Sequence, residues 1–425
     1  MIVLCEPQCE GISHEKVNSG FLTLVRTAFP GEPIRLHAPR SHQQALRGIL
    51  AHDGVAIDEL ECRDLEVHDG NTVRGVVAYH RQLARVLAET VEAGASEILF
   101  LSTSPVLLRI LKRLHRRPVF ASLRLVFVLH ADFEDIANDT FREVPTTAVP
   151  EPALRDKLRA LRPIELPQKI AAFARRRLAA RYAAAFKARF RARDALLHDA
   201  SDRFAYIALS PHIVANARAY VDVDALGVHV VEMPINFAPL RPAPSNDHLV
   251  LATFGYGDPG ALRQVVEHLD RLGARGYEIR IIGMDNRGLE SHPRVTCPSP
   301  GKRLARDEME RHAEDVDAFL ILYDGTRYRL SCSGSIFEAL SYNKPVLHIG
   351  NPCVVAFDSP ERPIGFAHDD LAALARHVAE MAGDYAVARL ELAKRRANIV
   401  AVRERLGMAS LAPKLRAVLR PGASG

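Results

Sequence analysis

Residues 331–350 read SCSGSIFEALSYNKPVLHIG, a stretch that joins a helix start to an abrupt turn into β structure. Small hydroxyl residues surround Gly334, and the apolar run that follows carries a single acidic residue, Glu338. Lys344 and Pro345 then interrupt the run. This order predicts a helix over 336–342 and a buried strand over 345–349.

Ser335 and Glu338 have the spacing of an S-x-x-E capping box, in which the two residues satisfy each other's backbone donors. Ser333 and Gly334 lie just before that predicted cap, where free N–H groups and the helix dipole favour an anion. Two interpretations therefore remain open, namely capping alone or capping together with phosphate binding. The extra small residues favour the second interpretation.

Short apolar runs alternate with longer amphipathic ones along most of the chain. Strands are predicted at 2–5, 34–37, 98–102, 123–130, 249–254, 278–283, 318–323 and 345–349. Helices are predicted at 73–93, 105–114, 259–272, 306–314, 336–342 and 369–381. Alternation of this kind predicts parallel sheets that are covered by helices on both faces.

The segment MPINFAPLRPAPSND, residues 233–247, separates the two halves and contains four prolines, which favour a linker over a helix or a central strand. We predict an α/β fold of two doubly wound Rossmann-like domains facing a cleft. The predicted parts are an N-terminal domain (1–236, with a basic amphipathic helix over 155–195), a linker (237–247), a C-terminal domain (248–395) and a final helix and tail (396–425). Ligands of such folds bind at the carboxyl ends of the strands, which here face the cleft.

The composition of the 425 residues is that of a globular protein, and no apolar run approaches the roughly 20 residues of a membrane-spanning helix. The first residues, MIVLCEPQ, predict a strand rather than a signal peptide. Six scattered cysteines indicate reduced thiols and a cytoplasmic location. Cys5, Cys9 and His14 match no zinc spacing, so no metal is expected.

The positive charge of the chain is concentrated in residues 155–193, which carry +11 of formal charge and leave −6 for the remainder. Leu178, Tyr182, Phe186 and Phe190 recur every four residues and would line one face of a helix there. Such a helix either lies on an anionic membrane surface or packs on the first domain with a solvated charged face. A nucleic-acid partner is not expected, because no recognised module is present and aromatics are 6%.

Gly255, Gly257 and Gly260 follow the predicted strand 249–254 with the G-x-G-x-x-G spacing of a dinucleotide site. Asp258 and Pro259, however, have the pattern of a helix N-cap and first helical residue. The capping carboxylate would then repel a pyrophosphate. A glycine turn that lets a ligand approach the backbone is favoured over an NAD or flavin site.

The runs 317–323, 333–340 and 343–346 together resemble the donor-binding half of nucleotide-sugar glycosyltransferases of the GT-B fold. The resemblance implies that backbone amides at a helix start hold the donor diphosphate, that Glu338 takes the ribose hydroxyls, and that no cofactor is needed beyond the nucleotide-sugar substrate. The donor-site residues that it implies are Gly255, Gly257, Tyr323, Ser333, Gly334, Ser335 and Glu338.

The first half extends the resemblance to the acceptor side of the same family. The loop 6–18 is similar to the glycine-bearing acceptor loop, and the stretch from His130 to Asp132 is similar to the active-site histidine segment. If transfer inverts configuration, a general base must reach the acceptor hydroxyl, and the candidates are His14, Glu15, His130 and Asp132. Each histidine also has an alternative to a catalytic role. His14 could be a solvated loop residue, and His130 could be a hydrogen-bonded residue at the end of a strand.

Two departures from the family pattern leave the donor sugar and the stereochemistry open. Leu330 stands where retaining members carry a second glutamate, eight residues before Glu338. The usual basic pair after strand 249–254 is also missing, so we expect Lys302 or Arg329 to supply positive charge to the diphosphate.

The resemblance implies a cytoplasmic glycosyltransferase that moves a sugar from a nucleotide-sugar to a saccharide or lipid-linked acceptor in polysaccharide or glycolipid biosynthesis. Residues 155–193 would place it peripherally on the inner face of the membrane. The alternatives are a nucleotide-sugar epimerase of the same fold, an NAD-dependent oxidoreductase using Gly255–Gly260, and a non-catalytic binding protein.

Overall fold

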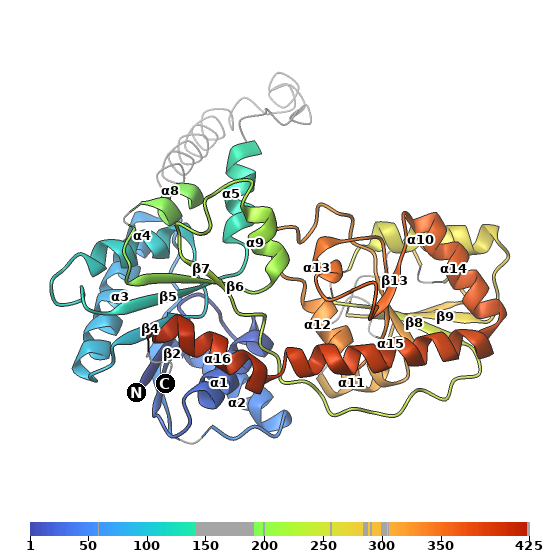
Figure 1. The fold of residues 1–425 in the computed structure, drawn as a ribbon, viewed down its shortest axis with the longest axis horizontal. Helices are drawn as coiled ribbons and strands as arrows, with labels where there is room; N and C mark the ends of the chain where they lie inside the picture. Colours follow the sequence, from blue (N-terminus) through green and yellow to red (C-terminus); the bar gives the residue numbers. More distant parts are fainter. Residues whose placement is uncertain are drawn as a thin grey trace, which may run out of the picture.

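The computed structural model describes residues 1–57, 59–141, 191–198, 200–255, 257–283, 288–289, 291–298, 304 and 306–422. The chain forms two lobes that lie side by side, and both chain ends lie on the first lobe (Figure 1). Each lobe is built around one sheet, in which every described strand pair runs parallel. The predicted α/β class with two Rossmann-like domains is confirmed.

The sheet of the first lobe has the strand order β3-β2-β1-β4-β5-β6-β7. Its strands are β1 (Ile2–Cys5), β2 (Ile34–Pro39), β3 (Leu60–Leu65), β4 (Glu97–Phe100), β5 (Arg124–Leu129), β6 (Phe204–Ala208) and β7 (Val228–Val230). The helices of this lobe are α1 (Glu15–Ala28), α2 (Arg40–His52), α3 (Val73–Glu92), α4 (Pro105–His115), α5 (Asp132–Phe141), α8 (Ala192–Leu197) and α9 (Pro211–Ala217).

The sheet of the second lobe has the order β10-β9-β8-β11-β12-β13. Its strands are β8 (Leu249–Phe254), β9 (Tyr277–Ile282), β10 (Val295–Thr296), β11 (Ala318–Ile321), β12 (Val346–His348) and β13 (Gly365–Ala367). The helices that follow β8 along the chain are α10 (Pro259–Arg271), α11 (Arg306–Glu314), α12 (Gly334–Ser341), α13 (Pro352–Val355), α14 (Leu371–Gly383), α15 (Tyr385–Arg405) and α16 (Met408–Leu419).

The strand orders place the functional loops. The direction of winding reverses between β1 and β4 in the first sheet and between β8 and β11 in the second. Crevices open at the carboxyl ends of strands at such switch points. The loops that leave β1, β8 and β11 are therefore the expected walls of a ligand site.

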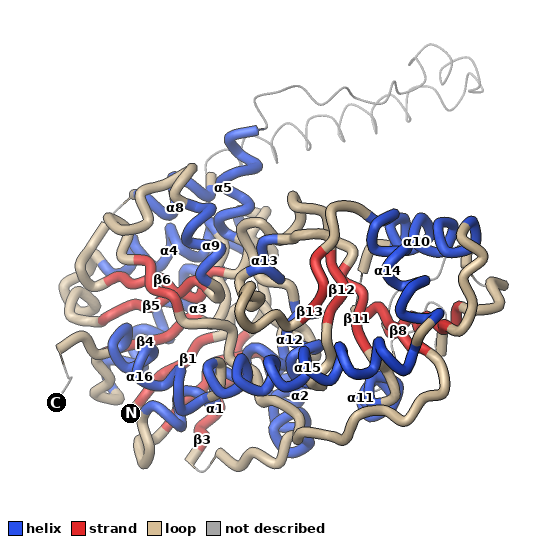
Figure 2. The backbone as a smooth tube through the Cα atoms, turned by 45° about the vertical axis from the view of Figure 1, so that its right-hand side comes forward, coloured by secondary structure: helices blue, strands red, loops and turns tan. Residues whose placement is uncertain are grey.

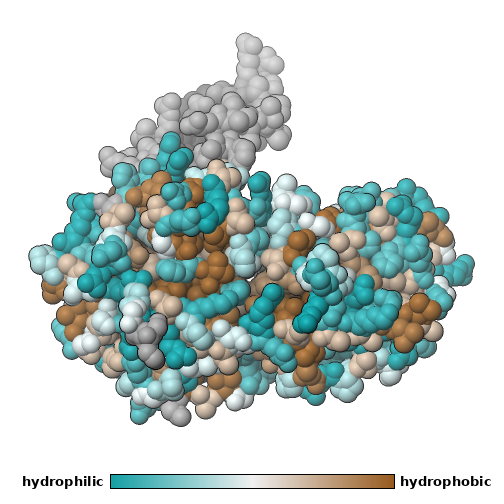
Figure 3. Space-filling view, in the orientation of Figure 1, coloured by the Kyte–Doolittle hydropathy of each residue, from teal (hydrophilic) through white to brown (hydrophobic). Residues whose placement is uncertain are grey.

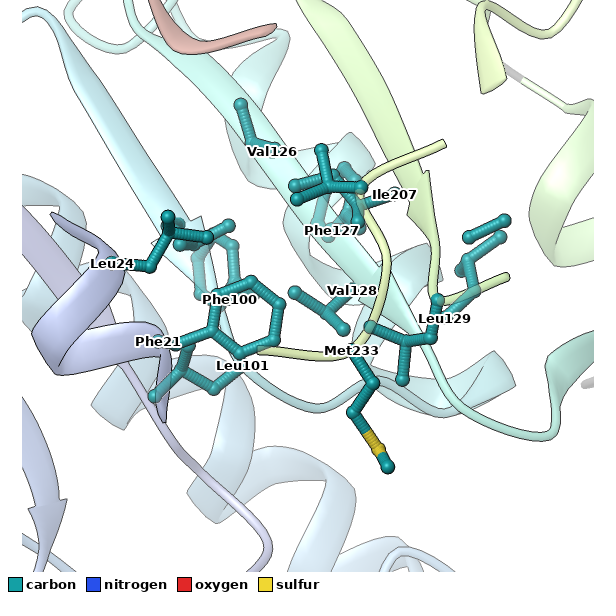
Figure 4. Packing of buried hydrophobic residues seen from close by; sticks show 14 of the residues in the cluster. Phe21, Leu24, Phe100, Leu101, Val126, Phe127, Val128, Leu129, Ile207 and Met233 are labelled. Atoms are coloured by element: carbon teal, nitrogen blue, oxygen red, sulfur yellow. The ribbon is translucent and has the colours of Figure 1, made fainter. Parts of the chain in front are cut away.

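The core of the first lobe explains why its strands are nearly continuous apolar runs. Strands β1, β4, β5 and β6 are buried along their whole lengths, apart from the first residue of β5, because helices cover both faces. Phe21 of α1 and Phe100 of β4 pack beside Phe127 of β5 and Met233 (Figure 4). Figure 2 shows the strands of each lobe with the helices arranged around them.

The C-terminal helices link the lobes. Helix α15 runs along the second lobe toward the first, and α16 then lies on the first lobe beside α1 (Figures 1 and 2). Arg420, just after α16, contacts Glu32 at 2.9 Å and Glu97 at 2.6 Å. Helix α16, near the C-terminal end of the sequence, therefore packs against the first lobe, whereas α15 lies along the second lobe.

Residues 231–248, all of them described, connect the two sheets without a helix or a strand. Polar and apolar side chains are intermixed on the face seen in Figure 3. Among the described residues, no helix combines the length and the apolar character needed to cross a bilayer. Residues 155–190, which hold most of the predicted basic helix, lie outside the described part of the chain.

Candidate active site

The loop after β1 is held by a buried carboxylate. The side chain of Glu6 is fully buried and accepts hydrogen bonds from the backbone N–H groups of Gln8 (2.9 Å) and Cys9 (3.0 Å). Ser102 Oγ and Asn18 Nδ2, the latter at 2.9 Å, also donate to it. A buried carboxylate is costly unless it is paired or hydrogen-bonded, and these four donors therefore fix the loop that leads to α1.

A buried histidine holds the other side of the same loop. His42 of α2 lies 2.9 Å from Asn18 Nδ2 through its Nε2 and 2.7 Å from the carbonyl of Gly11 through its Nδ1. This pattern requires the proton on Nδ1, because Nε2 accepts from the amide. The sequence analysis singled out neither Glu6 nor His42, although a polar residue directly after a buried strand is a recognisable signal.

Two predicted catalytic residues, His14 and His130, are in contact. His14 is the N-cap residue of α1 and has a left-handed backbone, with φ of 54°. Its ring centroid is 4.6 Å from that of His130, which follows β5 and is hydrogen-bonded through Nε2 to the carbonyl of Leu101 at 2.8 Å. The loop after β1 and the end of β5 thus meet at the carboxyl edge of the sheet.

Both imidazoles are uncharged at neutral pH. Desolvation lowers the pKa of His14 below its ordinary 6.5, although the side chain still reaches solvent. Desolvation and the neighbouring His14 ring lower the pKa of His130 to about 4. A neutral imidazole retains a lone pair and can accept a proton. His14 is the member of the pair that lines the groove described below.

Asp132 and Glu15, the two predicted acidic candidates, lie in different surroundings. Asp132 begins α5, is 5% exposed, and accepts from Thr103 Oγ1 at 2.9 and 3.0 Å. Burial raises the pKa of Asp132 from 3.8 to about 6. Glu15 lines the same groove as His14, whereas Asp132 is not among the lining residues.

Replacing Asp132 with asparagine is expected to stabilise the protein in a pH-dependent way. Because the folded-state pKa is raised, the carboxyl favours folding below pH 3.8, and this contribution is lost as the pH rises through about 6. Asp132→Asn should therefore raise the free energy of unfolding by about 2–3 kcal/mol at pH 8 and have little effect at pH 4. Urea unfolding at both pH values measures the difference. An effect of equal size at both would contradict the raised pKa.

Helix α12 begins one residue after Ser333, which is its N-cap and accepts from the Ser335 N–H at 3.3 Å. The predicted capping box of Ser335 and Glu338 is therefore wrong. The Ser335 hydroxyl instead donates to the carbonyl of Phe254 at 2.9 Å and bonds to Tyr323 OH at 2.9 Å. Ser335 and Tyr323 thus attach the start of α12 to the ends of β8 and β11.

The glycines at this site have different steric surroundings. Gly255 has φ of 72°, and a Cβ there would lie 3.4 Å from Ser335 Oγ. A side chain at this position would be strained by the backbone alone. A Cβ at Gly334 would meet no described atom within 4 Å, and Gly334 itself is exposed, so the described residues leave room beside the first residue of α12. That position suits an anion.

The structure confirms the predicted cap of α10. Asp258 accepts from the Ala261 N–H at 2.9 Å, and Pro259 is the first helical residue. Gly257, just before the cap, has φ of 47°. The carboxylate of Asp258 therefore occupies the helix start where a dinucleotide pyrophosphate would bind.

Arg327 is the cation that the structure brings to this turn. Its Nη1 is 3.4 Å from Asp258 Oδ2 and 3.3 Å from the carbonyl of Gly257, and its guanidinium is 5.8 Å from the Tyr323 ring centroid. The charge of Asp258 is thereby offset beside the glycine turn. Of the two cations that the sequence predicted for this role, Arg329 is exposed and lines a cavity of about 600 Å³ together with Arg327, and Lys302 lies outside the described residues.

The most direct link between the lobes at this site is an ion pair. Both carboxylate oxygens of Glu338 in α12 contact the ammonium of Lys16 in the first turn of α1. The side chains of Lys16 and Glu338 are 24% and 12% exposed. Lys16 Nζ also lies 5.7 Å from the ring centroid of Tyr342. No sequence motif marked Lys16, apart from its place two residues after His14.

A groove of about 770 Å³ runs between the lobes along this ion pair. It is lined by Ile12, His14, Glu15, Lys16, Ala45, Gly48, Ile49, His52, Phe254, Leu304, Arg306, Met309, Glu338 and Tyr342. Further polar contacts cross between the lobes here, because Arg306 forms an ion pair with Asp53 at 3.2 Å and His52 Nε2 lies 3.3 Å from the Glu310 carboxylate. Within the described part of the chain, no cluster of His, Cys, Asp and Glu side chains has a metal-binding arrangement.

No protein-family model and no curated protein sequence matches this chain. Solved structures match over both lobes. HepE of Anabaena in complex with UDP-glucose has a TM-score of 0.56 and 14% identity, and the match covers 99% of each chain. A glycosyltransferase of Rickettsia africae has a TM-score of 0.58 and 10% identity, again over 99% of each chain. These similarities establish that the chain has the two-lobed GT-B fold.

Proposed function

We propose that the protein is a glycosyltransferase that transfers a sugar from a nucleotide-sugar donor to a saccharide or lipid-linked acceptor. The observation that carries the proposal is the open N-terminus of α12 at Gly334, one turn before Glu338, which lines the same groove as His14. In this proposal the leaving group binds at the start of α12, and the groove that Glu338 shares with His14 gives the acceptor access to the sugar. The solved HepE complexes, which contain UDP or UDP-glucose, support a nucleotide-sugar as the ligand.

The donor diphosphate is assigned to the start of α12. The amide groups of Gly334 and Ser335 and the helix dipole would hold its negative charge, and Arg327 would add a positive charge from the side of the glycine turn. Negative charge grows on the diphosphate as its bond to the sugar breaks. Fixed donors aimed at such a charge contribute much of the rate, and removing one costs about 10²–10³-fold.

His14 is assigned the role of general base for an inverting transfer. It would take the proton of the acceptor hydroxyl while that oxygen attacks the anomeric carbon and the diphosphate leaves. Its lowered pKa supports this role, because the imidazole is then unprotonated at pH 7. His130 packs against the ring, and Glu15 is the alternative base in the groove.

The acceptor class and the cellular location are inferred from the cysteines and from the charge of the chain. We propose a cytoplasmic location, because no disulfide links any of the six cysteines, all of which lie in the described residues. The basic run 155–193 is the reason to propose a lipid-linked acceptor at the inner face of a membrane. An NAD-dependent oxidoreductase is disfavoured, because Asp258 caps α10 with its own carboxylate.

Thermal unfolding with a panel of nucleotides tests the donor class. UDP, GDP, CDP, ADP and dTDP are each added, and one of them is expected to raise Tm by about 3–5 °C at 100 times its Kd. The corresponding nucleotide-sugar should be consumed only when an acceptor is present. A free epimer that accumulates without acceptor would instead identify an epimerase, and stabilisation by NAD alone would identify an oxidoreductase.

A further inference from the structure

The Lys16–Glu338 pair joins the two walls of the groove, and the resemblance to GT-B glycosyltransferases implies that Glu338 binds the donor ribose. Lys16 and Glu338 are 322 positions apart in the chain and belong to different lobes. Both side chains are mostly buried, and the ammonium lies between the carboxylate and the ring of Tyr342. Ion pairs with this degree of burial are screened less by salt than exposed ones.

The ammonium of Lys16 binds the same carboxylate oxygens of Glu338 that a ribose at this position would bind. Lys16 Nζ contacts Oε1 and Oε2 of Glu338 together. Two neighbouring ribose hydroxyls that donate to one carboxylate also use its two oxygens. The lysine and the ribose would therefore share the same acceptors in the same half-buried space.

We propose that Lys16 competes with the donor ribose for Glu338, so that donor binding releases Lys16 from the second lobe. The inference rests on the proposed function and adds a self-occupied state to its donor site. Release would be local to the first turn of α1, because Glu6 and His42 hold the preceding loop through their own hydrogen bonds.

Release has a consequence for the acceptor side. Lys16 follows His14 and Glu15 on the same turn, and all three line the groove. Donor binding would convert a neutral ion pair into a free cation beside the proposed base. The charge at the acceptor side would then depend on whether the donor site is filled.

Lys16→Met tests the competition, because the proposal and simple electrostatics predict opposite changes in the affinity for the nucleotide. Removing a cation near a site for an anion ordinarily weakens binding. The proposal predicts instead that the nucleoside diphosphate selected in the thermal panel binds about three- to tenfold more tightly to the variant. Its 2′,3′-dideoxy form, which lacks the competing hydroxyls, should bind the variant no more tightly than the wild type. Isothermal titration calorimetry on the full chain measures both affinities.

Lys414→Met provides the matched control. Lys414 of α16 pairs with the largely buried Glu232 at 2.7 Å, also across a long sequence separation, and lines no part of the groove. Its removal should leave both affinities unchanged. Lys16→Gln, which keeps one hydrogen bond to Glu338, should shift affinity in the same direction by less and serves if the methionine variant does not fold.

The outcomes separate the inference from the proposed function. Unchanged or weaker binding of the diphosphate by Lys16→Met, or equal tightening of the dideoxy form, would overturn the competition. A wild-type protein that binds none of the nucleoside diphosphates would instead contradict the proposed function itself.

Discussion

Gly334→Asp is expected to remove donor binding and to lower turnover by at least about 100-fold while the protein stays folded. The new carboxylate would stand at the first position of α12, in the space proposed for the donor diphosphate, and would repel it. The same acid is favourable for the helix, because negative charge at an N-terminus interacts well with the dipole. A Cβ also fits there without touching any described atom within 4 Å. Affinity and stability should therefore change in opposite directions.

Calorimetric titration with the nucleoside diphosphate and thermal unfolding without it measure the two effects. Gly334→Ala is the matched control, since it adds a Cβ without charge and should retain most of the affinity. Undiminished nucleotide binding by Gly334→Asp would mean that the diphosphate lies elsewhere.

His14→Asn is expected to reduce turnover by about 10²–10⁴-fold while the affinity for the nucleoside diphosphate changes little. Asparagine is chosen because it tolerates the left-handed backbone of this position. The loss should be specific to the chemical step, since the role proposed for His14 is on the acceptor hydroxyl and not on the donor.

The pH profile gives a second reading of the same role. A general base works only when it is unprotonated, and the pKa of His14 lies below 6.5. Wild-type turnover should thus be full at pH 7 and fall as the pH drops below about 6.5, and this acidic limb should vanish in His14→Asn. Glu15→Gln should keep the limb. If Glu15→Gln removes the limb and His14→Asn does not, Glu15 is the base.

The fold class could be predicted from the sequence, because the pattern of apolar residues along a segment indicates how much of that segment is buried. Apolar runs such as 2–5 and 249–254 became the central strands β1 and β8, since a strand covered on both faces needs apolar residues throughout. The Asp258–Pro259 start of α10 was equally readable, because a cap depends on adjacent residues. Strand β3 (Leu60–Leu65) was missed because its charged, partly exposed residues do not form an apolar run.

The start of α12 shows where a local pattern failed. Ser333 and Ser335 are both residue types that cap helices well, and the S-x-x-E spacing led to the wrong choice of Ser335. Tertiary contacts decided, because the Ser335 hydroxyl is used by Phe254 and Tyr323 from other strands and Ser333 is left to cap.

By itself, the amino-acid sequence determined two parallel α/β lobes and the presence of a helix after Ser333, because these follow from periodicity and neighbouring residues. Only the tertiary structure showed that the rings of His14 and His130 are in contact, that Arg327 is hydrogen-bonded to Asp258, and that Lys16 forms an ion pair with Glu338. The physical reason is that these pairs join segments far apart in the chain, so their contacts depend on how strands and lobes are placed and not on any local pattern.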